Sequence, residues 1–318
     1  MREKENRLLV LSGPTASGKT ALGVALALQL DGEVVGADSM QIYRGMDIGT
    51  AKPTSAEMQG VPHHMLDVAD PAENYSAARY ATTASACVEE IFAKGKIPVV
   101  VGGTGLYIDA LVRGTEYAAA PGDSGLRERL EREYEALGGE EFRKKLAKTD
   151  PERAEKLHPG DKKRLVRAME VYCLTGETIT SHDERSKKMP SRYETFRVAL
   201  DFRDRETLYR RIDIRAKQMF SAGLTEEVRA LLEGGVPKNC TAMQAIGYKE
   251  VADFLEGKLS EAEAMELVQR RSRQYAKRQL TWLRGKKDTR WIFWEDAPDL
   301  SVAKILAEEF RCFCAEGR

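Results

Sequence analysis

The chain has 318 residues, 42% of them hydrophobic, and its 50 Lys and Arg side chains balance 50 Asp and Glu side chains. This composition suits one large domain or a core with a smaller module, and no apolar run approaches the roughly 18 residues that span a bilayer. The charged N-terminus shows no signal peptide, and the five cysteines lack zinc-binding spacing. We therefore expect a cytoplasmic protein with reduced thiols, no zinc finger and no membrane contact.

The first motif is a phosphate-binding loop that follows an apolar run of strand length and precedes a helical segment. Its residues, Gly13, Pro14, Thr15, Ala16, Ser17, Gly18, Lys19 and Thr20, match the pattern G-x-x-x-x-G-K-[ST]. The glycines let the backbone curl so that several N–H groups point inward, and Lys19 adds a full positive charge. The Thr20 hydroxyl is placed to reach a Mg²⁺ ion that shares the phosphates. The motif predicts binding of a diphosphate or polyphosphate, nucleotides such as ATP included.

Two further predicted strands end in polar residues at the same edge of the sheet. Residues 33–37 end at Asp38, and residues 97–101 end at a glycine turn that contains Thr104. Because ligands of open parallel sheets bind beyond the carboxyl ends of the strands, both side chains are expected near the phosphate loop. Three roles stay open for Asp38: a Mg²⁺ ligand, a carboxylate aimed at the substrate's nucleophile, or a cap of the next turn.

The segments between these strands predict a loop, a short strand and a helix. Residues 43–52 are rich in Gly and short side chains, which is typical of an active-site loop. His63 and His64 lie in a short strand without a third ligand nearby, which favours packing and hydrogen bonding over chemistry. An alanine-rich helix follows over 74–94, and Gly95 ends it.

The alternation of strands and helices stops near Glu116, which divides the chain. We predict an α/β fold with a P-loop, parallel-sheet core that begins in residues 1–116, a helical insertion domain in 117–190, and a helical C-terminal region in 191–318 that completes the core. In the insertion, a linker at 118–123 precedes helices over 126–148 and 151–174. A strand over 192–202 then rejoins the sheet.

Positive charge is concentrated near the C-terminus. Nine Lys or Arg residues lie between Val268 and Arg290, against one acid, Asp288. In a helix over 261–284, one stripe carries Arg270, Arg273, Lys277 and Arg284, and another carries Val268, Tyr275 and Trp282. Such a bias favours contact with a polyanion, and the alternative is the solvated face of an ordinary helix.

Taken together, the motifs resemble those of the tRNA isopentenyltransferase family, which includes the bacterial tRNA dimethylallyltransferases. The matching blocks span nearly the whole chain in family order: 13–20, 38–43, 47–53, 63–67, 101–107, 163–168, 245–250 and 275–282. The resemblance implies transfer of a dimethylallyl group from dimethylallyl diphosphate to the exocyclic amine of the adenosine 3′ to the anticodon, with Mg²⁺ as cofactor. The implied partners are the tRNA anticodon arm and dimethylallyl diphosphate, and we separately expect the protein to be a monomer.

The resemblance also implies residue roles. Lys19, Thr20 with Mg²⁺, and Arg215 would stabilise the departing diphosphate, Asp38 would take the proton of the amine, and Thr104 would position the substrates. The residues expected to contact tRNA are Asp38, Ser39, Met40, Gln41, Thr104, Arg127, Lys163, Arg164, Leu165, Arg167, Gly247, Tyr248 and Lys249, together with Arg273, Lys277, Arg278 and Arg284 of the basic helix.

Two other classes of protein fit parts of the sequence. A P-loop small-molecule kinase, with Asp38 as the base for a hydroxyl and Lys19 on ATP, explains the core and leaves the basic helix idle. A noncatalytic RNA-binding protein leaves the intact phosphate loop and Asp38 unexplained.

Overall fold

A parallel six-stranded sheet organises the larger part of the molecule. The computed structural model describes residues 7–114, 124–188 and 190–316. Its strands are β1 (Arg7–Ser12), β2 (Gly32–Gly36), β3 (His63–His64), β4 (Ile97–Gly102), β5 (Glu194–Phe202) and β6 (Thr289–Trp294). They lie in the order β3-β2-β4-β1-β5-β6, and every pairing is parallel. The predicted α/β fold is confirmed, and the predicted strands are present with small shifts at their ends.

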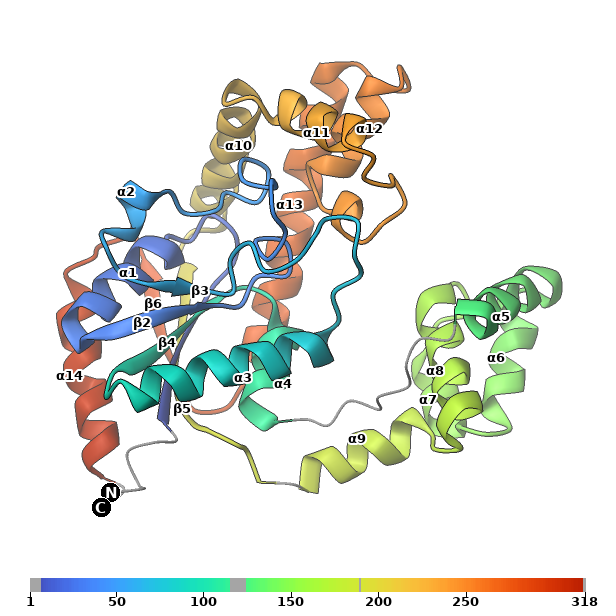
Figure 1. Cartoon of the computed structure of the whole chain (residues 1–318), viewed down its shortest axis with the longest axis horizontal. Helices are drawn as coiled ribbons and strands as arrows, with labels where there is room; N and C mark the ends of the chain where they lie inside the picture. Colours follow the sequence, from blue (N-terminus) through green and yellow to red (C-terminus); the bar gives the residue numbers. More distant parts are fainter. Residues whose placement is uncertain (1–6, 115–123, 189, 317–318) are drawn as a thin grey trace. The chain divides into compact units, whose positions relative to one another are not determined.

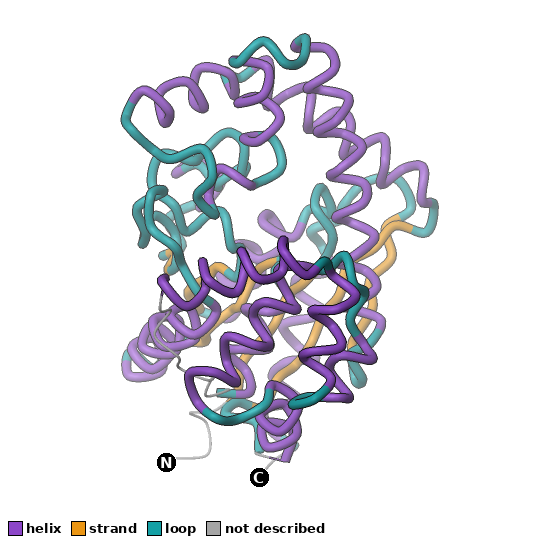
Figure 2. Tube along the Cα trace, turned by 90° about the vertical axis from the view of Figure 1, so that its right-hand side faces the viewer, coloured by secondary structure: helices purple, strands orange, loops and turns teal. Residues whose placement is uncertain are grey.

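Helices cover both faces of this sheet (Figure 1 and Figure 2). On β1, Leu8 and Val10 point into one apolar cluster, and Leu9 and Leu11 point into the other. The first cluster includes residues of α3 (Ala77–Ala93), α4 (Gly105–Arg113), α11 (Leu224–Glu233) and α12 (Tyr248–Leu255). The second includes residues of α1 (Lys19–Leu30), α10 (Arg205–Ser221), α13 (Glu261–Arg284) and α14 (Val302–Ala315). Burial on both faces explains why the strand sequences read as continuous apolar runs.

Helix boundaries follow from local capping. Ser76 accepts the N–H of Arg79 at the start of α3, and Gly95 follows the helix with φ of 72°. The long basic helix α13 begins with a capping box in which Ser260 and Glu263 satisfy each other's backbone N–H groups. A similar box, formed by Thr54 and Glu57, starts the short helix α2 (Ser55–Met58).

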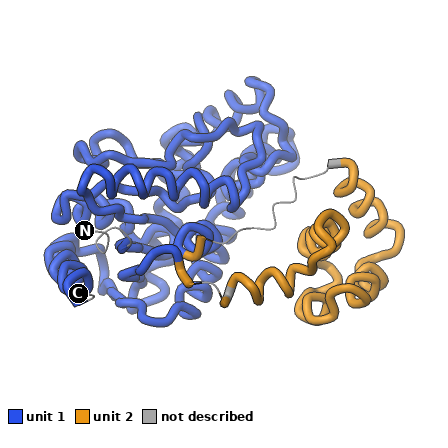
Figure 3. The backbone as a smooth tube through the Cα atoms, turned by 60° about the horizontal axis from the view of Figure 1, so that its bottom comes forward, with its two compact units in different colours: residues 1–112, 192–318 blue, residues 113–191 orange. Residues whose placement is uncertain are grey.

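Residues 113–191 form a compact unit of their own, separate from the unit of residues 1–112 and 192–318 (Figure 3). Its helices are α5 (Ser124–Leu137), α6 (Gly139–Ala147), α7 (Pro151–Lys156), α8 (Lys162–Thr175) and α9 (Ile179–Lys188). They enclose an apolar cluster that includes Phe142, Leu165 and Met169. The two predicted helical segments are each divided: Gly138, with φ of 77°, separates α5 from α6 within 126–148, and residues 157–161 separate α7 from α8 within 151–174.

Several sequence expectations fall outside the described residues. These are the charged N-terminus, the boundary near residue 116 with the linker at 118–123, and Met189 at the end of the insertion. A short 3₁₀ helix, η1 (Ala242–Gln244), completes the secondary structure of the described ranges. Among the described helices, none has the length and apolar character needed to cross a membrane.

Candidate active site

A cavity of about 750 Å³ opens at the carboxyl ends of β1, β2 and β4. Its lining includes the phosphate loop, the segment 38–41, part of the loop 49–53, and residues of α10 and α13. Parallel strands bring their carboxyl ends to one edge, which explains why residues far apart in the sequence meet there.

The phosphate loop curls between β1 and α1. The Ser17 N–H donates to Pro14 O at 3.3 Å, and both Ala16 and Gly18 adopt left-handed conformations, with φ of 64° and 83°. A Cβ on Gly18 would lie 2.5 Å from Pro298 Cγ, so only glycine fits. Helix α1 begins at Lys19 without a side-chain cap. Its first-turn N–H groups therefore offer an anion site beside the cavity.

Three side chains from distant elements fix this loop. The Thr15 N–H donates to Gln279 Oε1 at 2.9 Å, Arg211 Nε donates to Ala16 O at 3.1 Å, and Trp294 Nε1 donates to Ser17 O at 3.0 Å. Gln279 Nε2 also donates to Gly103 O at 3.0 Å, so it joins the two glycine turns. Sequence reasoning missed these roles. The nearest signal was the match over 275–282, which contains Gln279.

Two cations converge on the cavity. Burial and, after it, the positive charge of Arg215 lower the pKa of Lys19 to about 8, although the negative charge of Asp38 partly opposes them. Burial also lowers the pKa of Arg215, against the attraction of Asp38 and Glu57. Within the described chain, neither cation has a carboxylate at ion-pair distance, and the buried Arg215 Nε has no hydrogen-bond partner. Half-buried cations without a carboxylate partner, which line a cavity, fit an anionic ligand.

Asp38 caps a turn and also lines the cavity. Its Oδ1 accepts the N–H groups of Met40 at 2.9 Å and Gln41 at 3.4 Å. Capping of the turn, which the sequence posed as an alternative to a role in the site, is thus compatible with a position in the cavity wall. Thr104 lies beside it, because its Oγ1 accepts the Ser39 N–H at 3.0 Å and its own N–H donates to Ala37 O at 3.1 Å.

Few protein side chains near the cavity could serve as metal ligands. Thr20 lines the cavity, and the described residues contain no group of three His, Cys, Asp or Glu side chains arranged to hold a metal. Mg²⁺ commonly keeps water and substrate phosphates as ligands with few protein groups, so this donor set fits it. The two histidines are hydrogen-bonded: His64 Nε2 lies 2.7 Å from Glu33 Oε2, and His63 Nδ1 lies 2.8 Å from Val61 O.

The cations of α13 differ in their partners. Arg273 forms an ion pair with Asp213 at 2.6 Å, and Arg284 lies 3.8 Å from Asp201. Lys277 and Arg278 are exposed, and Arg278 lies over the ring of Tyr275 with its Cζ 5.6 Å from the centroid. Carboxylates of other elements therefore neutralise part of the charge on this stripe, and the expected contact of these four residues with tRNA stays a prediction.

The other residues expected to contact tRNA are divided between exposed and buried positions. In the insertion, Lys163 and Arg164 are exposed, whereas Leu165 is fully buried in the apolar cluster. Arg167 and Arg127 lie 2.7 and 3.8 Å from the buried carboxylate of Glu170.

In the larger unit, Gly247 and Tyr248 are buried, and the Tyr248 hydroxyl donates to Glu227 Oε1 at 2.5 Å. Lys249 beside them is half-buried. The side chains of Leu165 and Tyr248 are thus corrected to core positions, since neither is accessible to a ligand.

Comparison with known proteins identifies similar chains over nearly the full length. Residues 41–286 match the family model described as IPP transferase. A tRNA dimethylallyltransferase of Pelotomaculum thermopropionicum is 44% identical over 99% of this chain and 98% of its own, and one of Geobacillus kaustophilus is 45% identical over 92% and 91%. A full-length tRNA isopentenylpyrophosphate transferase of Bacillus halodurans has a similar crystal structure (39% identity, 98% of this chain and 97% of that one, TM-score 0.74). The structure of a eukaryotic dimethylallyltransferase acting on tRNA is similar as well (31% identity, 97% and 78%, TM-score 0.78).

Proposed function

The chain belongs to the IPP transferase family, and we propose that its cavity transfers a dimethylallyl group from dimethylallyl diphosphate to the exocyclic amine of an adenosine beside the tRNA anticodon. The protein is a prenyl-group transferase that modifies tRNA. The kinase alternative is not favoured, because the relatives named above are dimethylallyltransferases. The observation that carries the finer proposal is the pair of unpaired cations, Lys19 and Arg215, which line one cavity with Asp38.

The chemistry has two demands. The exocyclic amine of adenine is a weak nucleophile, because its lone pair is delocalised into the ring. The diphosphate leaves readily only if the negative charge that develops on it is neutralised. Lys19, Arg215 and the N–H groups of the phosphate loop would supply this neutralisation from fixed positions in a poorly solvated cavity.

The proposed transfer forms one N–C bond, breaks one C–O bond and moves one proton. The amine lone pair forms the new N–C bond to the allylic carbon, and the electron pair of the breaking C–O bond leaves on the diphosphate. Asp38 would hydrogen-bond the amine and take its proton, since its Oδ1 serves the backbone turn and its carboxylate faces the cavity. Mg²⁺, held by Thr20 and the substrate oxygens, would add positive charge at the diphosphate.

The tRNA side of the reaction requires an accessible base. A stacked adenosine cannot reach a cavity of this kind, so the target nucleotide would be flipped out of the anticodon stack. The exposed cations of α13 and of the insertion, Lys277, Arg278, Lys163 and Arg164, are the proposed contacts to the tRNA backbone.

One experiment separates the classes of function. The protein is incubated with tRNA and Mg²⁺, with either dimethylallyl diphosphate or ATP, and the tRNA is digested and analysed by mass spectrometry. We expect one adenosine to gain the mass of a dimethylallyl group with the prenyl diphosphate and no change with ATP. An unmodified tRNA in the presence of the prenyl diphosphate would contradict the proposal.

A further inference from the structure

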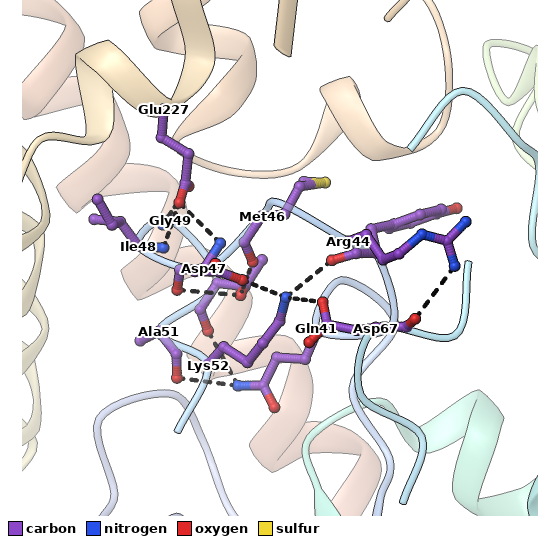
Figure 4. Close-up of polar contacts among 12 residues, drawn as sticks. Gln41, Arg44, Met46, Asp47, Ile48, Gly49, Ala51, Lys52, Asp67 and Glu227 are labelled. Carbon is purple, nitrogen blue, oxygen red and sulfur yellow. Dashed lines mark hydrogen bonds and ion pairs between the residues drawn. The ribbon is translucent and has the colours of Figure 1, made fainter. Parts of the chain in front are cut away.

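One wall of the cavity is a loop whose backbone is hydrogen-bonded to a side chain of another element, helix α11 (Figure 4). The lining residues of this wall are Gln41, Gly49, Thr50, Ala51 and Pro53. The anchor is Glu227 of α11, whose carboxylate accepts three successive backbone N–H groups: Asp47 at 2.8 Å, Ile48 at 2.7 Å and Gly49 at 3.1 Å. Glu227 itself does not line the cavity, and its hydrogen bonds among the described residues do not reach the phosphate loop.

The contact is specific for a carboxylate. Glu227 Oε1 accepts the Tyr248 hydroxyl at 2.5 Å in addition to the Gly49 N–H, so four donors converge on two oxygens. Hydrogen bonds to an ionised acceptor are about twice as strong as neutral ones, and an N–H turn of this form is a natural anion site. The turn also fits tightly, since a Cβ on Gly49 would lie 2.5 Å from the Tyr248 ring.

The anchored turn is connected to Asp38 by one residue, Gln41, through its side-chain amide on one side and its backbone N–H on the other. Gln41 Nε2 donates to Thr50 O at 3.2 Å and to Ala51 O at 3.1 Å, and the Gln41 N–H donates to Asp38 Oδ1 at 3.4 Å. Ala51, with φ of 45°, occupies the left-handed region that residues with a Cβ disfavour. Such a conformation persists only where the surroundings impose it. The hydrogen bonds of Gln41 and the turn held by Glu227 impose it here.

A second contact braces the same loop from within. Lys52 Nζ lies 2.5 Å from Asp47 Oδ1, 2.6 Å from Asp67 Oδ1 and 3.0 Å from Tyr43 O, and its side chain is only 6% exposed. Tyr43 and Asp47 lie in the loop itself, whereas Asp67 follows β3; Figure 4 labels Asp47, Lys52 and Asp67. Lys52 therefore shapes the loop, whereas Glu227 ties it to the helical layer that packs on the sheet.

We propose that Glu227 is a positioning residue for the transfer reaction: it fixes the turn 47–49 and, through Gln41, sets the orientation of Asp38 toward the amine. The inference rests on the proposed function of Asp38. It predicts that loss of the carboxylate slows the reaction and leaves binding of the prenyl diphosphate intact, since no contact joins Glu227 to the phosphate loop among the described residues.

The test compares Glu227→Gln with Glu226→Gln. Glu226 is the exposed neighbour on the same helix, so its substitution removes the same charge without touching the loop. The amide of Glu227→Gln presents N–H groups where the turn needs acceptors. We expect kcat to fall by about tenfold to a hundredfold for Glu227→Gln, because a small misplacement of a reacting group has effects of this size, with KM for dimethylallyl diphosphate within about twofold of wild type. Glu226→Gln should match wild type.

A double-mutant cycle distinguishes positioning from general destabilisation. If Glu227 acts through Asp38, Glu227→Gln should have little further effect on kcat in the Asp38→Ala background, whereas independent effects would multiply. Should Glu227→Gln fail to fold, as judged by its thermal transition, Tyr248→Phe takes its place. It keeps the three N–H bonds and removes the fourth, and we expect a fall in kcat of about threefold that Asp38→Ala likewise abolishes.

The outcomes separate the two proposals. A wild-type protein that does not prenylate tRNA overturns the proposed function. If the wild type is active, the inference about Glu227 is overturned when Glu227→Gln has the same kcat as Glu226→Gln. It is also overturned when the effects of Glu227→Gln and Asp38→Ala on kcat multiply. Where only Tyr248→Phe folds, an unchanged kcat of that variant overturns it.

Discussion

The cavity and helix α13 both concentrate positive charge, and they differ in what surrounds it. In the cavity, Lys19 and Arg215 are desolvated and unpaired within the described chain. On α13, Arg271 and Arg273 each pair with a carboxylate, Glu250 and Asp213. The count of nine bases against one acid made the helix the conspicuous cationic feature of the sequence. The comparison teaches that a cation is available to an anionic ligand when the fold gives it no carboxylate partner. The number of basic residues in a segment does not by itself show this.

The largest effect should come from the carboxylate that faces the two cavity cations. Asp38→Ala is expected to lower turnover by about 10²–10⁴-fold, the usual contribution of a positioned proton acceptor. Binding of tRNA and of dimethylallyl diphosphate should change far less. Single-turnover kinetics at saturating substrates measure this directly. An unchanged rate there would remove Asp38 from the role of base.

The cavity cations are expected to lower the stability of the folded protein while they accelerate the transfer reaction. Arg215→Met is expected to slow transfer by about 10²–10³-fold, because the charge it supplies counts most as the diphosphate leaves. It should also raise the thermal midpoint by about 2–4 °C, since it relieves a buried, unpaired charge worth about 1 kcal/mol. Arg229→Met, at an exposed site on α11, is the matched control and should change neither quantity. A lower midpoint for Arg215→Met would mean that Arg215 is paired in solution.

The pH dependence of Lys19 gives two signatures of opposite sign. Its pKa of about 8 in the folded protein lies below the value of about 10.4 in the unfolded chain. The unfolded state thus binds more protons between these values, so stability should rise with pH across that range. Affinity for the prenyl diphosphate should fall roughly tenfold from pH 7 to pH 9, because the proposed binding group is the charged form of Lys19. Calorimetry at several pH values measures both, and Lys19→Met should lose both dependences.

How much of this the sequence could predict depends on the separation of the partners. The phosphate loop and the residues after each strand are local patterns, so the position of the cavity and of Lys19 and Asp38 could be read directly. Gln279, which joins Thr15 to Gly103, is more than 170 residues from either, and no local pattern encodes such a pairing. The contact of Glu227 with the turn 47–49 could not be predicted for the same reason.

The helical periodicity of the sequence predicted only part of the burial pattern of α13. It correctly placed Val268 in the interior, and the helix bounds of 261–284 were confirmed. Trp282 is half-buried and donates its Nε1 proton to Asp109 Oδ2 at 3.1 Å, so the stripe that carries it is not purely apolar. Burial of Leu165 and Tyr248 depends on the tertiary structure around them, which family motifs do not describe.

The smallest effects should come from α13, where the paired and unpaired cations can be compared on one helix. Lys277→Gln should leave stability unchanged and reduce the slope of log K for tRNA against log salt by about 0.7–0.9, the value for one phosphate contact. Arg273→Gln should instead cost about 0.2–1 kcal/mol of stability, the usual range for a partly exposed ion pair, and should change the slope less.

The decisive variant on this helix is Asp213→Asn. It removes the carboxylate that neutralises Arg273 and leaves the guanidinium in place. If α13 faces tRNA, the freed charge should steepen the salt slope and strengthen binding at low salt, which is a gain that damage to the fold would not produce. The gain should disappear in Asp213→Asn combined with Arg273→Gln. If Asp213→Asn leaves the slope unchanged while Lys277→Gln also has no effect, α13 is a solvated face, and the insertion alone must bind the anticodon arm.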